Sequence, residues 1–300
     1  MKRCSFLSLA TFALVVLLSG AALAQWDEVE IKLTPVAGNI HLLEGRGGKI
    51  AVCAGEDGAF LVDAQFSQLN EKITAAVATL DTKPIRFILN THWHGDHAGG
   101  NENFGNQGVI LVAHNNVRQR LSERQFVKFV KRETMPHPMV ARPIVTFTDE
   151  IEFHMNGEDI LAMHVNPAHT DGDAVVFFRN ANVVHGGDVY WGGMYPFIDL
   201  SSGGSIDGFV EASHKLLALV DDQTRIIPGH GPVGGRAELQ AFHDMLKSVR
   251  AAIQSAIDEG ASLEETIGRK PTAAYDEEWG QGWIKPDEMV TFVYESLTEE

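Results

Sequence analysis

Short apolar segments separated by turn-forming residues dominate the first part of the chain. Between residues 29 and 63, apolar and β-branched side chains gather in runs of four or five, with glycines between the runs. Such runs predict short strands at 29–33, 40–43, 49–53 and 59–62. The pattern then changes to an apolar residue every three or four positions, which predicts a helix over 68–80. A further apolar strand is predicted at 85–89.

The same alternation of strands and helices returns in the second part of the chain. The pattern predicts a helix from 115 into the 120s and a basic, proline-containing loop over 128–142. Strands are predicted at 109–112, 144–147, 151–154, 160–164, 174–178, 183–185 and 225–227. Two longer helices are expected at 205–220, where Ser205 is a plausible N-cap, and at 236–259.

The order of strands followed by helices therefore occurs twice. Two half-domains of this kind, packed sheet to sheet, predict an α/β (α+β) fold, an αββα sandwich of two β-sheets flanked by helices. No linker-like stretch divides the chain, so we expect one domain over 25–260. The tail over 261–300 is short, acidic and aromatic, and we expect it to pack back on the domain as a terminal helix.

The first 24 residues have the pattern of a secretory signal peptide. Lys2 and Arg3 precede an apolar run over 6–18, and Ala22-Leu23-Ala24 supplies small residues for cleavage. The run is shorter than the ~20 residues that span a bilayer, so an uncleaved anchor is the less favoured alternative. We expect a secreted protein, periplasmic in a host with an outer membrane, in which Cys53 remains as a buried, inert thiol.

The charge balance narrows the possible partners. The chain carries a formal net charge of −16, and removal of the signal's two positive charges would make it −18. Nucleic acids and anionic membranes are held by Lys and Arg, so such an excess of acid disfavours both. The composition therefore favours a small-molecule substrate, with no nucleic acid and no stable membrane association.

The densest group of metal-ligand side chains is His92-Trp93-His94-Gly95-Asp96-His97, directly after the strand predicted at 85–89. Four good ligands within six residues cannot all reach one tetrahedral ion, but a tight loop can divide them between two ions. Three more candidates stand in Gly- and Pro-flanked turns, where side chains point into a cleft more often than into a core: His169, Asp188 and His230.

This order of motifs resembles the metallo-β-lactamase-fold superfamily over about residues 29–245. The resemblance implies a first metal held by His92, His94 and His169. It implies a second metal held by Asp96, His97 and His230, with Asp188 as the bridge. It also implies that Asp63, at the end of a strand, is a buried carboxylate that orients a ligating histidine.

Five imidazoles and two carboxylates form a nitrogen-rich set that suits two Zn²⁺, with iron or manganese as alternatives. Relatives that use di-iron for redox chemistry carry Glu where this chain has His94, so hydrolysis is favoured over electron transfer. Two close ions would lower the pKa of a shared water, and the resulting hydroxide would attack a carbonyl. Asp96 is the expected catalytic residue, since it could orient the hydroxide and pass on its proton.

The sequence leaves the substrate open between two classes. The motif blocks look most like secreted metallo-β-lactamases, which favours hydrolysis of a β-lactam or related cyclic amide. Those relatives, however, have Cys where Asp188 stands and a carboxylate-binding Lys where Trp191 stands. A bridging Asp is instead the pattern of glyoxalase II-like thioesterases and of lactonases, the alternative reading. Phosphoester hydrolysis, a role in periplasmic oxidation and a non-catalytic zinc-binding or partner-docking module are minor alternatives.

Loop aromatics near the ligands are candidates for a substrate-pocket wall, and ordinary packing is the equally open alternative. They are Trp93, Tyr190, Trp191, Tyr195 and Phe197. The other histidines are predicted to be structural or solvated, including His185, which lies three residues before Asp188. Asp171 and Asp173 are interpreted as members of an Asx-type turn after His169.

Overall fold

A computed structural model describes residues 25–298 and arranges their main strands in two sheets. The first sheet has the order β1-β2-β3-β4-β5-β6-β9, antiparallel up to β4 and parallel from β4 to β9. Its strands are β1 (Lys32–Ala37), β2 (Ile40–Glu44), β3 (Ile50–Cys53), β4 (Ala59–Val62), β5 (Ile85–Asn90), β6 (Ile110–His114) and β9 (Val145–Phe147). This sheet carries the predicted six-residue ligand motif at the end of β5.

The second sheet has the order β10-β11-β12-β13-β14. Its neighbours are antiparallel except for the parallel pair β13–β14. The strands are β10 (Glu150–Met155), β11 (Glu158–His164), β12 (Ala174–Phe178), β13 (Val183–His185) and β14 (Arg225–Ile227). The other three predicted ligands lie in the loops that follow β11, β13 and β14.

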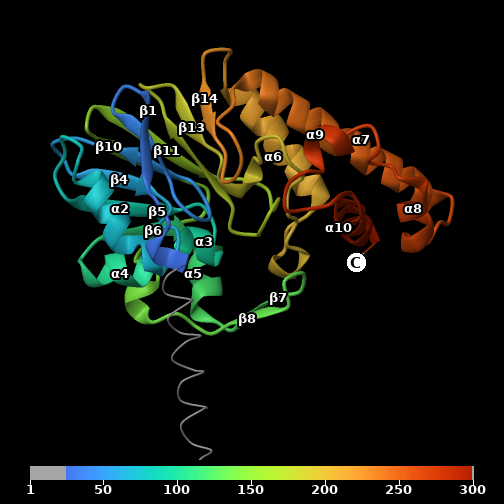
Figure 1. Cartoon of the computed structure of the whole chain (residues 1–300), viewed down its shortest axis with the longest axis horizontal. Helices are drawn as coiled ribbons and strands as arrows, with labels where there is room; N and C mark the ends of the chain where they lie inside the picture. The colour runs from blue at the N-terminus through green and yellow to red at the C-terminus, as the bar shows by residue number, and fades with distance from the viewer. Residues whose placement is uncertain (1–24, 299–300) are drawn as a thin grey trace, which may run out of the picture.

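Helices cover the outer face of each sheet (Figure 1). The first half contributes η1 (Ser67–Leu69), α2 (Asn70–Val77), α3 (Gly95–Ala98), α4 (Asn101–Asn106), α5 (Asn115–Ser122) and η2 (Met139–Ala141). The second half contributes η3 (Gly187–Val189), η4 (Leu200–Ser202), α6 (Ile206–Leu219), α7 (Arg236–Asp258), α8 (Leu263–Arg269), α9 (Asp276–Trp279) and α10 (Pro286–Thr298). Ser205 caps α6 as predicted, since its hydroxyl accepts a hydrogen bond from the Gly208 backbone N–H.

Three apolar clusters fill the layers. One lies between the two sheets and includes Phe60 and Leu89 from the first and Val176 from the second. A second packs the first sheet against α2 and α4, and a third packs the second sheet against α6, α7 and α10. A helical layer, two sheets and a second helical layer make an αββα sandwich, so the predicted fold class is confirmed.

Some predicted elements needed correction. The first strand begins at Lys32 rather than 29 and runs to Ala37, because its pairing with β2 continues up to a tight turn in which Gly38 has φ 54°. The stretch predicted as a loop over 128–142 contains most of a small hairpin, β7 (Gln125–Val127) with β8 (Arg132–Thr134), and also η2. The tail is not one terminal helix but three helices, α8, α9 and α10, and α10 packs against α6, α7 and α8.

Two expectations concern the N-terminus and membranes. The predicted signal peptide, residues 1–24, lies outside the described residues. Within the described part of the chain, no helix is both long enough and apolar enough to cross a membrane.

Candidate metal centre

The six-residue motif lies in the turn between β5 and α3. β5 ends at Asn90, and the backbone N–H of Ala98 then bonds to the carbonyl of His94, so the chain turns tightly over the intervening residues. A Cβ at Gly99 would lie 2.2 Å from the Gly95 carbonyl oxygen, and one at Gly100 would lie 2.5 Å from that of Ala64. Only glycine fits at such approaches, which explains the Gly-Gly pair after the motif.

The seven predicted ligands come together at one end of the two sheets. Their ligand atoms form three groups within which all atoms lie within 4.8 Å of one another. The groups are His92–His94–His169, His92–His97–Asp188 and Asp96–His97–His230. The first and last groups are the two ligand triads that the resemblance implied, and Asp188 lies close to residues of both.

In the first triad the imidazole tautomers leave lone pairs for a metal ion. His169 donates through Nδ1 to the Phe197 carbonyl, so its Nε2 carries a lone pair, 2.8 Å from Nδ1 of His94. Nε2 of His92 is buried without a hydrogen-bond partner. Burial lowers the pKa of His92 well below its ordinary value and that of His169 to about 4. Neutral, unpaired imidazole nitrogens fit a metal ion, which would supply their missing partner.

The second triad is richer in charge. Asp188 Oδ1 lies 3.2 Å from Nε2 of His97, and its Oδ2 lies 3.4 Å from His169 Nε2 and 3.5 Å from His230 Nε2. Burial opposes a charge on His230, but Asp188 and Asp96 outweigh it and raise the pKa of His230 to about 9. The carboxylates thus favour a cation at this place, and a metal ion could replace the proton.

Asp63 orients His97, a member of the second triad, through a hydrogen bond. Its Oδ2 accepts a hydrogen bond from Nδ1 of His97 at 2.8 Å, and it also accepts two hydrogen bonds from the backbone and hydroxyl of Thr91. The carboxylate is fully buried. This leaves Nε2 of His97 to face Asp188, the arrangement that the resemblance implied for Asp63.

Asp199 has the corresponding place beside the first triad, and the sequence gave no reason to select it. Its Oδ2 accepts a hydrogen bond from Nε2 of His94 at 2.9 Å, so Nδ1 of His94 points toward His169. The hydroxyls of Ser201 and Ser202 donate to the same carboxylate. The only local signal was an Asp followed closely by two Ser, which is a common turn pattern.

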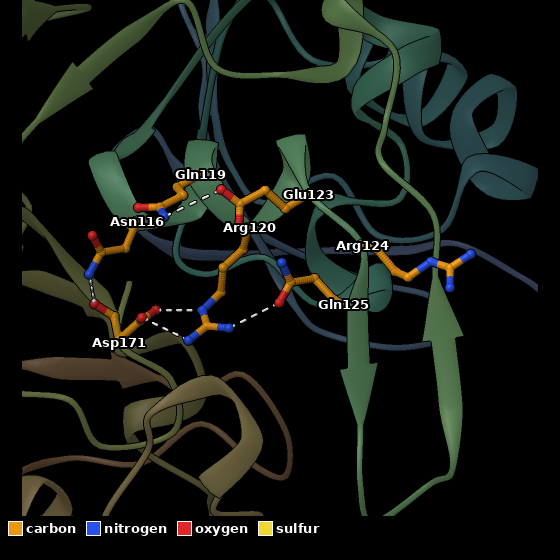
Figure 2. A pocket seen from close by; sticks show the side chains of 7 residues that line it. All are labelled: Asn116, Gln119, Arg120, Glu123, Arg124, Gln125 and Asp171. Atoms are coloured by element: carbon orange, nitrogen blue, oxygen red, sulfur yellow. Dashed lines mark hydrogen bonds and ion pairs between the residues drawn. The ribbon is translucent and has the colours of Figure 1, made fainter.

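Two carboxylates, Asp171 and Asp173, hold the loop that carries His169 in place. Asp173 accepts hydrogen bonds from the backbone N–H groups of His169 and Thr170, which precede it, whereas an Asx turn uses an N–H that follows the aspartate, so the interpretation as an Asx-type turn is wrong. Asp171 instead reaches α5, where Arg120 donates to it through Nε at 2.7 Å and a terminal nitrogen at 2.8 Å. Figure 2 shows this pair on the wall of a polar hollow, with Arg120 also bonded to Gln125. The ion pair therefore joins the first half of the chain to the His169 loop.

Two of the five aromatic residues proposed as a pocket wall are core residues instead. Tyr190 is 1% exposed and packs on Phe242 of α7. Tyr195 is fully buried, and its hydroxyl donates to Asp276 in the tail. Because their rings face the helical layer, the prediction that they line a substrate pocket is wrong.

The other three aromatic residues contact ligands directly. The ring of Trp93 lies edge-on to His94 with centroids 4.8 Å apart, and that of Phe197 stacks on His94 at 6.0 Å. Trp191 lies 4.5 Å from the His230 ring and donates its Nε1–H to the Asp188 carbonyl. All three are nearly buried, so they shape and rigidify the centre.

His185 is a structural residue. Its Nδ1 accepts a hydrogen bond from the Gly187 backbone, and its Nε2 donates to the Lys49 carbonyl at 3.1 Å. Both ring nitrogens therefore have protein partners, and neither is left for a metal ion.

A family model covers this whole arrangement. The model of the metallo-beta-lactamase superfamily matches residues 33–230, which include all seven candidate ligands. The chain belongs to the metallo-beta-lactamase superfamily. The resemblance inferred from the motifs is thus confirmed. Members of the superfamily are hydrolases that typically bind metal ions, and the His/Asp cluster of this chain could hold such ions.

Individual relatives are distant. Metallo-beta-lactamase IND-1 of Chryseobacterium indologenes is 22% identical over 249 residues, 80% of this chain and 98% of that protein. The crystal structure of DIM-1 metallo-beta-lactamase superposes with a TM-score of 0.60 and 19% identity, covering 73% of this chain and 99% of the other. A variant of the sec-alkyl sulfatase PisA1 gives a TM-score of 0.69 at 15% identity, covering 89% of this chain and 50% of the other. At such identities the structural likeness shows the metallo-beta-lactamase fold alone.

Proposed function

We propose that this chain is a binuclear zinc hydrolase of activated carbonyl compounds, with β-lactams as the first substrate class. The observation that carries the proposal is the convergence of two triads, six residues in all, on Asp188, the seventh candidate ligand. The nitrogen-rich donor set favours zinc, and iron or manganese would be accepted by similar ligands. Similarity to IND-1 along nearly its full length supports the β-lactam class.

The residues have distinct tasks in this reaction. His92, His94 and His169 would hold one ion, Asp96, His97 and His230 the other, and Asp188 would contact both. Bound there, the two ions would lower the pKa of a shared water and polarise the substrate carbonyl. The side chain of Asp96 is 27% exposed, which leaves it open to accept a hydrogen bond from the attacking water. It can then take the proton and deliver it to the leaving atom.

A lactone or thioester is the second candidate, and a specific contact favours it. An indole rather than an ammonium group lies beside His230, since Trp191 packs on that ring and donates to the Asp188 carbonyl. A β-lactam carboxylate would therefore have to find another cation. Lactones and thioesters carry no obligatory carboxylate beside the scissile bond and do not need one.

A side-by-side substrate panel tests the proposal. The zinc-loaded protein from Gln25 onward would be given a chromogenic β-lactam, a lactone and a thioester, with chelator-treated protein and Asp96→Ala as controls. We expect β-lactam opening that both controls abolish. Turnover of the lactone or thioester alone would replace the first candidate by the second. Tight metal binding without rate enhancement on any substrate would favour a non-catalytic zinc-binding or partner-docking module.

We also propose export through the N-terminal signal, with a periplasmic location in a host that has an outer membrane. The basic start, short apolar run and small-residue cleavage motif support it. Mass spectrometry of the protein from the native host would give an N-terminus at Gln25, and a full-length mature chain would contradict the proposal.

A further inference from the structure

A continuous aromatic path leads from the first triad to the protein surface. Phe197 stacks on His94, with ring centroids 6.0 Å apart and an interplanar angle of 19°. Phe129 lies 5.4 Å from Phe197, and Trp283 lies 5.5 Å from both of them. Trp283 is 52% exposed, so the path begins at a metal-ligand candidate and ends in solvent.

Two segments outside the ligand loops build this path, and both are anchored. Phe129 belongs to the β7–β8 hairpin, which lies beside η4 (Figure 1). The backbone N–H of Lys128 donates to Ser201, and its Nζ pairs with Glu295 of α10 at 3.1 Å. The hairpin is thereby held between the η4 loop and α10, so Phe129 has a fixed position.

Trp283 comes from the tail, beyond the residues matched by the superfamily model. The tail is fixed to the loop that follows Asp188: the Tyr195 N–H donates to the Trp279 carbonyl at 2.9 Å, and a Cβ at Gly282 would lie 2.8 Å from that of Met194. A half-exposed indole on so closely packed a segment leaves much apolar area in water. A ligand that covered the indole would be stabilised by the removal of this apolar area from water.

We propose that Trp283 and Phe129, which both pack on the buried ring of Phe197, form a binding surface for an apolar substituent of the substrate, an acyl chain or a hydrophobic ring. The substituent is favoured over a second copy or a lipid surface because the aromatic path begins at His94, a candidate ligand of the reaction centre. The surface thus places a chain of this kind next to the scissile bond. This inference rests on the proposed function in that it assigns a part of the same substrate.

Direct binding to metal-free protein tests the surface independently of hydrolysis. Butanoate, hexanoate, octanoate and decanoate would be titrated calorimetrically into wild type, Trp283→Ala and Trp283→Phe. Complete burial raises affinity about fourfold per CH₂, so we expect about twofold per CH₂ on this half-open surface. Trp283→Ala should remove the chain-length dependence, whereas Trp283→Phe should retain most of it.

Phe126→Ala is the matched control, since Phe126 is 55% exposed on the same hairpin but has no ring contact with the path among the described residues. It should bind as wild type does. Equal losses in the two Ala variants, or no loss in Trp283→Ala, would overturn the proposal. So would vesicle binding or dimerisation that Trp283→Ala abolishes, because a membrane or a second copy would then be the occupant.

Kinetics on zinc-loaded protein separate this inference from the proposed function. For p-nitrophenyl esters from acetate to decanoate, KM should fall with chain length in wild type and stay flat in Trp283→Ala, with kcat little changed. Chain-length-dependent binding without hydrolysis of any substrate would contradict the proposed function and still support the binding surface. Hydrolysis with no chain-length dependence in KM would contradict the binding surface and still support the proposed function.

Discussion

The Asp63 carboxylate lies 2.8 Å from Nδ1 of His97, and both side chains are completely buried. Asp63 itself has φ 71°, a left-handed backbone that an aspartate adopts at some cost. The turn after β4 thus aims the carboxylate at the ligand motif, and the contact decides which nitrogen of His97 is left for a metal.

Asp63→Asn should weaken the second metal. An amide has one acceptor oxygen in place of two and carries no negative charge, so the asparagine cannot accept all three hydrogen bonds of Asp63 and polarises the His97 ring less. We expect a 10–100-fold loss of affinity at that site, measured by competition with a chromophoric chelator. The exposed variant Asp81→Asn serves as the control and should bind both ions as wild type does. Unchanged affinity in Asp63→Asn would show that the contact has no influence on the metal.

Asp199→Asn should weaken the first metal instead. The variant loses the carboxylate that fixes Nε2–H of His94, and the ring can then present the wrong nitrogen. We expect a loss of affinity of similar size, confined to one of two stoichiometric binding steps and not the step that Asp63→Asn weakens. If Asp63→Asn and Asp199→Asn weakened the same step, the assignment of one carboxylate to each triad would be wrong.

Gly229→Ala should disable the centre through a collision. A Cβ at this position would lie 1.9 Å from Oδ1 of Asp188, and the neighbouring backbone leaves the carboxylate little room to move. We expect a loss of activity of at least about a hundredfold, the order seen when a ligand-orienting contact fails by an ångström. In contrast, Gly268→Ala in α8 meets no atom within 4 Å and should leave activity intact and stabilise the fold by about 0.5–1 kcal/mol.

Arg120 and Asp171 should prove energetically coupled. The pair is bidentate and partly buried, with side chains 17% and 30% exposed. A double-mutant cycle with Ala at both positions, followed by urea denaturation, should give a coupling energy of about 1–2 kcal/mol. The exposed pair Arg179–Glu152 should give less than about 0.5 kcal/mol. Equal coupling energies in both pairs would mean that the Arg120–Asp171 pair stabilises the protein no more than an exposed ion pair does.

His114 should make the fold sensitive to mild acid. Its ring stacks on His164 with centroids 3.8 Å apart, and burial together with that neighbour lowers the pKa of His114 to about 4. Since the unfolded chain takes up this proton near pH 6.5 and the folded chain only near pH 4, stability should fall as pH drops between these values.

The measurement is urea denaturation of metal-free protein between pH 7 and pH 4.5. Between pH 7 and pH 4.5, the free energy of unfolding of His114→Gln should fall by about 2 kcal/mol less than that of wild type, because this range covers most of the interval between the two pKa values of His114. His214→Gln, at an exposed position, should follow wild type. Identical pH slopes for all three proteins would contradict the proposed role of His114.

Much of the site could be predicted because metal ligands obey local rules. Four donors in six residues, and His169, Asp188 and His230 in Gly- or Pro-flanked turns, are recognisable wherever the chain puts them. Their division into triads followed from the resemblance, and the structure brings the same side chains together. Strands such as β4, β12 and β14 were predicted at their observed bounds, since short apolar runs between turns have few other solutions.

Contacts between distant segments determined several side-chain positions that the local sequence pattern could not predict. Tyr190 and Tyr195 resemble Trp191 and Phe197 in sequence context, and all four are buried. The tyrosines pack on α7 and the tail, whereas Trp191 and Phe197 contact His230 and His94. Asp199 became a partner of His94 across 105 residues, and Trp283 reached Phe197 from beyond the matched family region. The sequence by itself determined the ligand types, the two-sheet fold and the charge. The tertiary structure alone determined which carboxylate orients which imidazole and which aromatic rings face solvent, because those depend on side-chain packing between segments far apart in the chain.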